Sequence, residues 1–413
     1  MKKRIGAALA ALLLLFGLVQ FGELAKSGDV FGALASAWEG KYHVGNRAYL
    51  DVEQQAVSTR GYDALPARLK EAYRQLDEYV YKLYRDVDDI VIPRDDFQML
   101  LEYYRADHPQ VFWLGSAYRY QYDPESGDLS RVTLSFSCRD PESGKERSFT
   151  RSRVEEMAAE LAAAADRILS GVTEEMSGYD TVLYLHDYLA EHVAYDESAP
   201  YQHTAYGALV ENRAVCDGYA FAMQYLLLRA GIECQIVYGD DRTGDPEHHA
   251  WNVVELDGKW YHLDVTWDIP PEGTTHAIHA NFLLTTEQAL QRRVIHSPIN
   301  GVENEDARSW YPPVENCTDG SLNYYQSNGL YVESLTDESV ARILMEANRA
   351  LIMGEDQVQF QFATRYGMQQ FVREAQENVP RVARGFPYSC EQYQTRILTL
   401  QEDRLLILQF NYA

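Results

Sequence analysis

The dipeptide Asp257-Gly258 lies between two strand-like runs and constrains the fold more than any other short feature of the chain. The runs at 250–256 and 259–265 contain aromatic and β-branched residues, which favour strands. An Asp-Gly pair between such runs is a strong signal for a two-residue hairpin turn, which fixes how the strands pair. With this turn Leu256 faces Lys259, so facing residues have numbers that sum to 515 (256 + 259). The sequence therefore predicts an antiparallel hairpin with a defined register.

This register sorts two adjacent histidines onto opposite faces of the sheet. Facing residues and residues two apart share a face, which places His249, Trp251, Asp264 and Thr266 together. His248 then points to the other face. Asp264 is close enough to accept a ring N–H of His249 and so orient the imidazole as a base. A one-residue bulge would reverse the choice between the two histidines, so this prediction depends on the register.

Cys216 is the candidate nucleophile because a loop enters a strongly helical run at this residue. The predicted helix covers 216–230, and Gly231 is placed to cap its C-terminus. A thiol at a helix N-terminus lies at the positive end of the macrodipole, which favours the reactive thiolate. Taken alone, a cysteine there is more often a small buried residue. The joint placement of a cysteine, a histidine and an aspartate nevertheless favours a catalytic triad.

A metal site is the alternative use of the same side chains. Cys216, His249, His262 and Asp264 could supply ligands, and His262 falls on the same face as Asp264. No pair among them has compact ligand spacing such as HExxH, and the chain contains no CxxC. We therefore predict the triad, with no metal and no cofactor.

Three segments in chain order carry a resemblance to a known family. They read Thr204-Ala205-Tyr206-Gly207-Ala208-Leu209 through Val215-Cys216-Asp217-Gly218-Tyr219-Ala220, then His249-Ala250-Trp251-Asn252, then Leu263-Asp264-Val265-Thr266-Trp267-Asp268. Together they resemble the bacterial transglutaminase-like family, over roughly residues 178–290. The resemblance implies a papain-like core in which Cys216 is the nucleophile, His249 the general base and acid, and Asp264 the orienting carboxylate.

The resemblance also implies a cleft around the triad. Trp251 would pack beside the site and shield it from water. The backbone N–H of Cys216 is one natural donor to an oxyanion, and a side-chain donor is expected from the preceding loop. Gln202 and Tyr206 are the two candidates for that donor, although for Tyr206 a plain packing role is favoured. Nothing in the chain resembles the β-sandwich domains of the calcium-dependent animal enzymes, so calcium activation is not implied.

The predicted fold class is α+β. A papain-like, transglutaminase-like core, with the helix bearing Cys216 packed on an antiparallel sheet, is flanked by smaller α+β segments. The expected units are a signal peptide or membrane anchor at 1–30, an N-terminal α+β region at 31–170, the transglutaminase-like domain at 171–300 and a C-terminal α+β domain at 320–413. The C-terminal domain is expected to run strand, helix, strand, helix and a final hairpin.

The N-terminus predicts where the protein works. Lys2, Lys3 and Arg4 precede an uncharged, mostly apolar run of 17 residues from Ile5 to Phe21. This pattern is typical of a secretory signal or an uncleaved anchor, and the two alternatives stay open. We expect the rest of the chain to lie outside the cytoplasm and to meet the membrane only through this segment.

Composition narrows the function further. The 37 basic and 62 acidic residues give a formal charge of −25, which makes nucleic acid a poor partner. Five cysteines leave at least one without an intramolecular disulfide. We predict an exported cysteine-dependent acyl-transfer enzyme that acts on peptide or carboxamide bonds of a peptide or protein substrate at the cell envelope. The alternative is a catalytically silent surface protein that uses the same fold for binding or scaffolding.

Overall fold

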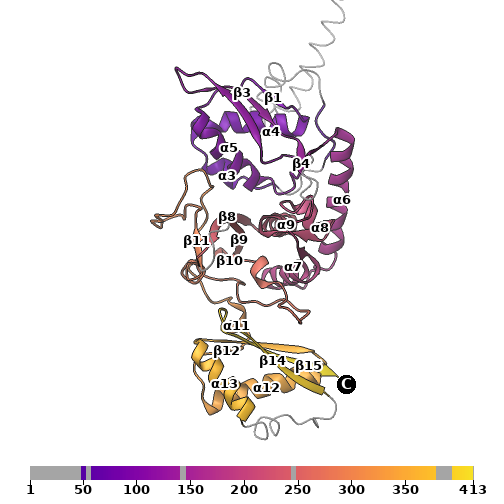
Figure 1. The fold of residues 1–413 in the computed structure, drawn as a ribbon, viewed down its shortest axis with the longest axis vertical. Helices are drawn as coiled ribbons and strands as arrows, with labels where there is room; N and C mark the ends of the chain where they lie inside the picture. Colours follow the sequence, from indigo (N-terminus) through magenta and orange to yellow (C-terminus); the bar gives the residue numbers. More distant parts are fainter. Residues whose placement is uncertain (1–47, 53–56, 140–145, 243–247, 378–392, 413) are drawn as a thin grey trace, which may run out of the picture.

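The computed structural model describes residues 48–52, 57–139, 146–242, 248–377 and 393–412 of the 413-residue chain. These residues form three units that follow one another along the long axis of the molecule (Figure 1). The N-terminal unit, up to residue 148, lies at one end. The central unit, residues 151–300, carries the predicted triad. The C-terminal unit, residues 324–412, lies at the other end.

The N-terminal unit combines short helices with a small antiparallel sheet of order β1-β3-β2. Its elements are α3 (Arg60–Ala64), η1 (Ala67–Leu69), α4 (Lys70–Lys82), β1 (Asp86–Val87), α5 (Arg94–Asp107), β2 (Tyr118–Tyr122), β3 (Leu129–Leu134), β4 (Ser137–Arg139) and β5 (Glu146–Ser148). The sequence predicted one helix over 63–86. The helix is instead broken at Leu65-Pro66, because a residue before proline is pushed out of the helical region, and Leu65 has φ −62° and ψ 141°.

The central unit packs helices against a four-stranded antiparallel sheet of order β10-β9-β8-β11. Its helices are α6 (Arg151–Leu169), α7 (Gly178–His192), α8 (Ala205–Leu209), α9 (Cys216–Arg229), η2 (Thr266–Asp268) and α10 (Thr286–Ala289). The sheet contains β8 (Cys234–Asp241), β9 (His248–Leu256), β10 (Lys259–Leu263) and β11 (Arg293–Ile295). A separate parallel pair joins β6 (Ala194–Tyr195) to β7 (Arg213–Ala214).

Helix α9 is the centre of this unit. It is buried on nearly every side, as expected for a helix that is apolar all round. Asn252 Nδ2 on β9 donates to the Ala220 carbonyl at 3.0 Å, which ties the helix to the sheet. Gly231, at φ 77°, follows the helix and allows the chain to turn back toward β8. The predicted packing of the Cys216 helix on an antiparallel sheet is confirmed.

The hairpin register is also confirmed. Leu256 pairs with Lys259, and the pairing continues to Asn252 with Leu263. Both turn residues have positive φ, 52° at Asp257 and 76° at Gly258, as a two-residue turn of this type requires. The predicted strand to Val265 is too long by two residues, however.

The second strand ends early because Asp264 leaves the ladder. Its backbone N–H donates to the Asn281 carbonyl at 3.1 Å. Its Oδ1 accepts the N–H of Trp267 at 3.2 Å, which turns the chain into η2.

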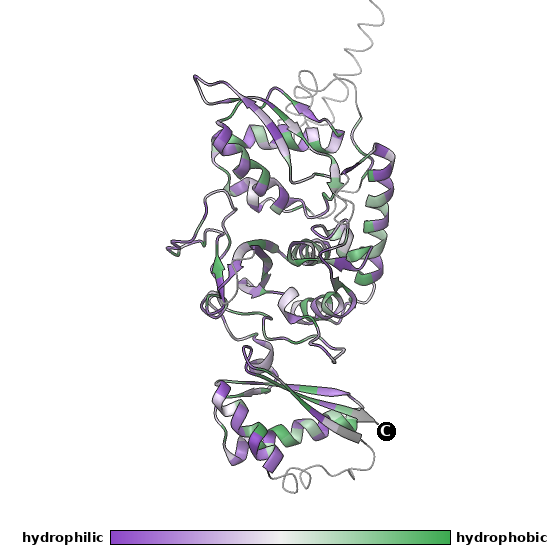
Figure 2. Cartoon of the chain, viewed as in Figure 1, coloured by the Kyte–Doolittle hydropathy of each residue, from purple (hydrophilic) through white to green (hydrophobic). Residues whose placement is uncertain are grey.

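The C-terminal unit is built on a second hydrophobic cluster, which also includes Ile278 and Ala280 of the central unit. Its elements are α11 (Tyr324–Ser327), β12 (Tyr331–Val332), α12 (Asp337–Met353), β13 (Gln357–Phe362), α13 (Arg365–Glu377), β14 (Tyr393–Leu400) and β15 (Leu405–Tyr412). The sheet order is β12-β13-β15-β14. Both hydrophobic and hydrophilic residues occur along its helices, as one-sided burial requires (Figure 2).

The predicted signal or anchor at 1–30 lies outside the described residues, as does Cys390, one of the five cysteines. Within the described part of the chain, no helix combines the length and the apolar character that a membrane span needs. Cys216, Cys234 and Cys317 are free thiols.

Candidate active site

Cys216 is the first residue of α9, and a loop packed against the helix start fixes its position. The N–H of Val215, the residue before it, donates to the Gln202 carbonyl at 3.0 Å. Gly218 allows this loop to come close, because a Cβ there would lie 2.2 Å from the Gln202 carbonyl oxygen. The Cys216 side chain stays partly exposed, and its Sγ lies 3.7 Å from the His248 carbonyl oxygen. The thiol therefore adjoins the strand end that carries both histidines.

His249 is buried and held on three sides. Its Nε2 lies 2.8 Å from Asp264 Oδ2, which confirms the hydrogen bond that the register predicted. Its ring stacks on that of Trp251, with centroids 5.5 Å apart, and on that of Trp267, with centroids 5.0 Å apart. The two indoles restrict rotation of the imidazole and help to bury it. Trp251 thus lies beside the histidine, where the sequence predicted a shielding residue.

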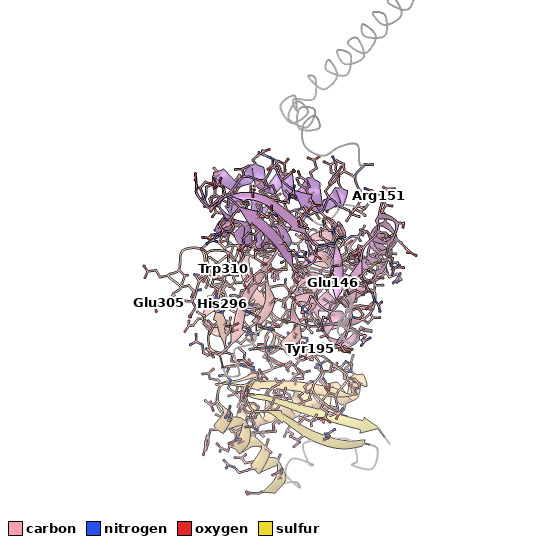
Figure 3. All side chains as sticks on the ribbon, turned by 45° about the horizontal axis from the view of Figure 1, so that its top comes forward. Glu146, Arg151, Tyr195, His296, Glu305 and Trp310 are labelled. Carbon is pink, nitrogen blue, oxygen red and sulfur yellow. The ribbon has the colours of Figure 1, made fainter. Side chains whose placement is uncertain are left out.

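His248 lies on the other face of the strand. Its side chain is 79% exposed, and its Nδ1 is 3.6 Å from Asp240 Oδ1. The neighbouring His296 occupies the other oxygen of Asp240 at 2.7 Å. Figure 3 places His296 near Trp310, beside the loop whose outer end carries Glu305. His248 is therefore a surface residue, as the hairpin register predicted.

Asp264 is buried and binds two partners, an imidazole and a guanidinium, through one oxygen. Oδ2 receives His249 and also Arg293, whose Nη2 is at 2.5 Å and Nε at 3.2 Å. Burial opposes ionisation, but the electrostatic interactions and hydrogen bonds with His249 and Arg293 outweigh it and hold the pKa of Asp264 below its usual range. Asp264 is therefore an ionised carboxylate in a largely dry site.

Sequence reasoning missed Arg293, the first residue of β11. Its side chain is 2% exposed. Nη2 also donates to Asn281 Oδ1 at 2.8 Å, and the guanidinium lies 3.9 Å from the centre of the Trp267 ring. Arg293 thus joins Asp264 to the indole that covers His249. Its 29-residue separation from Asp264 gives no local signal, because only the pairing of β11 with β8 brings it in.

Both ring nitrogens of His262 face partners other than Cys216. Trp251 Nε1 donates to His262 Nδ1 at 3.0 Å, and the other ring nitrogen faces Thr286 at 3.3 Å. Burial, reinforced by the Arg293 charge, lowers the pKa of His262 to about 3. The ring is therefore a neutral acceptor that positions Trp251.

The two oxyanion candidates differ in placement. Tyr206 is buried against Phe112 and Tyr201, and its hydroxyl donates to Glu160 at 2.5 Å. That environment is the one expected of a packing residue. Gln202 lies in the loop against the start of α9, and its Nε2 is 3.2 Å from the ring of His203. Of the two, Gln202 is the one whose main chain touches the Cys216 turn.

A cavity of about 540 Å³ opens beside the start of α9. Gln202, His203 and Asp217 line it from the central unit, while Arg105 and Phe112 line it from the N-terminal unit. His203 Nδ1 lies 2.9 Å from both oxygens of Asp217. The N-terminal unit therefore forms one wall of a cavity that reaches the residue next to Cys216.

The thiol itself corrects one expectation. Its position at the helix N-terminus was expected to favour the thiolate, but burial and the carboxylate of Asp217 raise the pKa of Cys216 to about 12. Backbone N–H groups of Ala250 and Asp217 oppose this rise without overcoming it. Desolvation of the anion is the largest of these effects. The surroundings of Cys216 therefore favour the neutral thiol.

Comparison with known protein families gives a match that includes the three candidate triad residues. A family model described as the transglutaminase-like superfamily matches residues 162–265, from within α6 to the residue after Asp264. Residues 162–265 form a transglutaminase-like superfamily domain. The match contains Cys216, His249 and Asp264, whereas Arg293 lies beyond it.

Individual relatives are similar over a small part of their length. The human kyphoscoliosis peptidase is 27% identical over 117 residues, which cover 25% of this chain and 18% of the relative. The mouse kyphoscoliosis peptidase is 27% identical over 135 residues, 28% of this chain and 20% of the relative. The matched part of the chain thus spans about a fifth of these curated relatives. A solved structure of a TGase is 17% identical, with a TM-score of 0.28, over 54% of this chain and 60% of that one.

Proposed function

We propose that this protein is a cysteine-dependent acyl-transfer enzyme that acts on peptide or carboxamide bonds outside the cytoplasm. One observation carries the proposal. The 2.8 Å hydrogen bond between His249 and Asp264 lies where the thiol of Cys216 meets the start of β9. The transglutaminase-like domain and its peptidase relatives support the same reaction class. Our proposal extends this similarity to a mechanism.

The first half of the reaction forms an acyl-enzyme. Because Nε2 of His249 is bonded to Asp264, Nδ1 is the nitrogen left to accept the thiol proton. As Sγ attacks the carbonyl carbon, the proton moves to Nδ1, so the neutral thiol needs no stable thiolate beforehand. The oxyanion is held by the N–H of Cys216, with the amide of Gln202 as the proposed second donor.

The second half releases the product. The tetrahedral intermediate collapses, the C–N bond breaks, and the leaving amine takes the proton from His249. Water then attacks the thioester and gives a carboxylic acid, while an amine would give a new amide. We propose hydrolysis as the default, because water is always present. The buried carboxylate of Asp264 stabilises the imidazolium in both steps.

The location and partners follow from the sequence. The charged start and apolar run at 1–30 support export, with membrane contact only through that segment. A peptide or protein substrate at the cell envelope is the matching partner, and the charge of −25 argues against nucleic acid. A C-terminal alkaline phosphatase fusion, which is active only after export, tests the location. Inactive but intact fusion protein would contradict export.

One observation favours the alternative, a catalytically silent binding or scaffolding protein. Burial and Asp217 raise the pKa of Cys216 to about 12, so the resting thiol is poorly nucleophilic. In this case Cys216 and His249 would be structural residues. The two proposals differ in whether His249 assists the thiol.

Alkylation by iodoacetamide, followed by mass spectrometry at single cysteines, tests this difference. Cys216 should react near neutral pH faster than Cys138, which is also partly exposed. His249→Ala should slow the reaction at Cys216 at least tenfold and leave Cys138 unchanged, because a base typically contributes 10²–10⁴-fold to proton transfer. Equal rates at Cys216 in the parent and in folded His249→Ala protein would favour the silent binding protein.

A further inference from the structure

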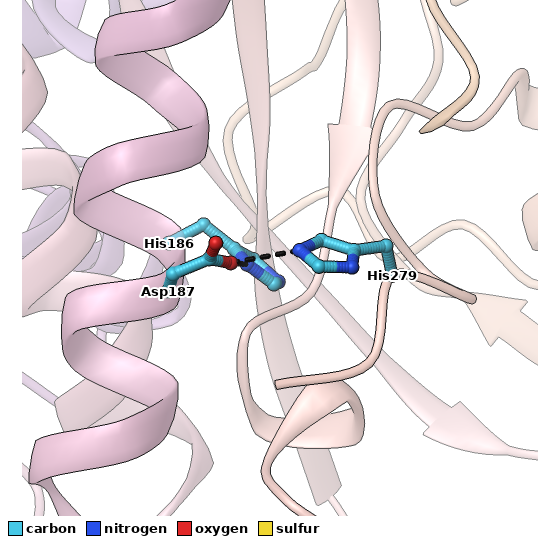
Figure 4. A group of neighbouring side chains, drawn as sticks. All are labelled: His186, Asp187 and His279. Atoms are coloured by element: carbon cyan, nitrogen blue, oxygen red, sulfur yellow. Dashed lines mark hydrogen bonds and ion pairs between the residues drawn. The ribbon is translucent and has the colours of Figure 1, made fainter. Parts of the chain in front are cut away.

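A second histidine–carboxylate cluster lies away from Cys216, between α7 and the loop that precedes α10. His186 Nδ1 is 2.9 Å from Asp187 Oδ1, and His279 Nε2 is 2.8 Å from the same oxygen. The three donor atoms lie within 4.8 Å of one another. Figure 4 shows the rings of His186 and His279 meeting at the Asp187 carboxylate. We propose that this cluster binds a divalent transition-metal ion, with Zn²⁺ as the best match.

The donor set suits that ion. Two imidazole nitrogens and one carboxylate oxygen are ligands that zinc accepts, and a water molecule would complete a four-coordinate site. Zinc ligands at 2.0–2.1 Å in a tetrahedron stand about 3.3 Å from one another. The present N···O distances of 2.8 and 2.9 Å need to widen by only about half an ångström to admit the ion.

The far nitrogen of His186 faces a carboxylate of the kind that a metal-bound histidine needs. Nε2 makes no hydrogen bond within the part of the chain that the structure describes, but it lies 3.3 Å from Asp268 Oδ2, and both side chains are fully buried. Asp268 is itself fixed by Asn281, whose backbone N–H donates at 3.0 Å and whose Nδ2 donates at 2.9 Å. A ligand histidine typically donates its second N–H to a carboxylate, which sets the tautomer and strengthens the ligand.

His279 is held by two tyrosines, while its Nδ1 makes no hydrogen bond among the described residues. Its ring stacks on Tyr324 with centroids 3.8 Å apart, and its backbone N–H donates to the Tyr325 hydroxyl at 3.1 Å. The side chains of His186 and His279 are 0% and 7% exposed, whereas that of Asp187 is 34% exposed. The cluster therefore combines rigid, buried nitrogens with a carboxylate that solvent can reach, which gives an ion an entry path.

The ion would have a structural role. Asp187 and His186 belong to α7, His279 to the loop before α10, and Asp268 follows the triad residue Asp264 by four positions. Tyr324 and Tyr325 belong to α11 of the C-terminal unit. One ion would thus join α7, the η2 turn and the border with the C-terminal unit. This role is independent of acyl transfer at Cys216.

Metal titration of the full chain tests the proposal in a Cys216→Ala background, which removes the catalytic thiol as a competing ligand. The chelator-treated protein should bind one Co²⁺ per chain with the visible absorption of a four-coordinate site, and Zn²⁺ should displace it. Zn²⁺ should also raise the Tm, because it binds the folded state. His279→Gln should lose at least about 100-fold in affinity, since even outer partners cost 10–100-fold.

His276→Gln is the matched control, because His276 is only three residues away but bonds to Glu191 and Asp356 instead. It should bind Co²⁺ like the parent. If His279→Gln does not fold, Asp187→Asn replaces it, since that side chain is partly exposed and keeps its shape. Absence of saturable Co²⁺ binding in the Cys216→Ala parent would overturn the proposal. So would equal affinity in a folded ligand variant.

Discussion

A single carboxylate oxygen decides how the candidate triad is held together. Asp264 Oδ2 receives the imidazole of His249 and the guanidinium of Arg293, both of them buried. Arg293 also shares the negative charge that would otherwise stabilise the imidazolium alone. The same contact couples catalysis to stability, because the aspartate is the counter-charge of a buried arginine.

Asp264→Asn should therefore both inactivate and destabilise the protein. The amide can hold His249 in the wrong tautomer, and it leaves the buried Arg293 without a counter-charge. Breaking a buried pair by removing one partner costs about 3–5 kcal/mol. Urea unfolding measures the loss, and the double variant Asp264→Asn, Arg293→Gln should recover part of it. A change in stability below about 1 kcal/mol would contradict the buried-pair argument.

The same residue predicts a pH dependence. The folded-state pKa of Asp264 lies below its usual value, so its ionised form stabilises the fold. This contribution is fully present above the unfolded pKa of about 3.9 and is lost as the pH falls through the folded pKa. The stability difference between wild type and Asp264→Asn, measured by urea unfolding, should be constant from about pH 5 to 7 and shrink below about pH 4. A difference that grows on acidification would contradict this sign.

At the scale of elements, the start of α9 depends on one close approach. Gly218 lies in the first turn, where a Cβ would meet the Gln202 carbonyl oxygen at 2.2 Å and the Ala214 Cβ at 2.9 Å. The loop backbone has little freedom to retreat, because Gln202 also accepts the N–H of Val215. Helices usually prefer alanine to glycine, but the close contact at position 218 favours glycine, and here the contact is the larger effect.

Gly218→Ala should destabilise the protein by about 1–3 kcal/mol, the usual range for overpacking. It should also slow alkylation of Cys216, because the clash displaces the turn that carries the thiol. Gly367→Ala in α13 is the matched control. Its Cβ would meet the Thr364 hydroxyl at 3.2 Å and the Phe362 ring at 3.8 Å, both of them side chains, and the helix should gain or lose less than about 1 kcal/mol. Thermal unfolding of both variants measures the contrast, and similar Tm shifts would refute it.

At the scale of the whole molecule, two side chains, Arg292 and Trp267, connect the C-terminal unit to His249 of the triad. Asp403, in the β14–β15 turn, forms an ion pair with Arg292, and Glu402 lies 3.5 Å from the same guanidinium. Arg292 lies 4.6 Å from the centre of the Trp267 ring, which stacks on His249. The final hairpin thereby supports the indole that covers the histidine.

Asp403→Asn should loosen this support and lower the alkylation rate of Cys216 by about two- to fivefold, a loss below 1 kcal/mol as expected for a partly exposed pair. Glu402→Gln is the matched control and should have a smaller effect, because its side chain is 61% exposed and its contact with Arg292 is longer. The rates are measured on folded variants at one pH. A larger effect from Glu402→Gln would contradict the proposed path.

The sequence by itself determined the local parts of this protein. Asp257-Gly258 set the turn, the turn set the register, and the register selected His249 over His248. The apolar run after Cys216 and the glycine at 231 determined helix α9 in the same way. These features depend on neighbours within about twenty residues, where propensity, turn chemistry and side-chain alternation are strong.

Only the tertiary structure determined the contacts between residues that lie far apart in the sequence. Arg293 reaches Asp264 only because β11 pairs with β8, and His279 reaches Asp187 across 92 residues. The thiol pKa of Cys216 also needed the structure, since burial and Asp217 oppose the helix end and only their geometry gives the balance. No repeating pattern of residues signals such contacts, because they depend on which surfaces pack together after the local elements have formed.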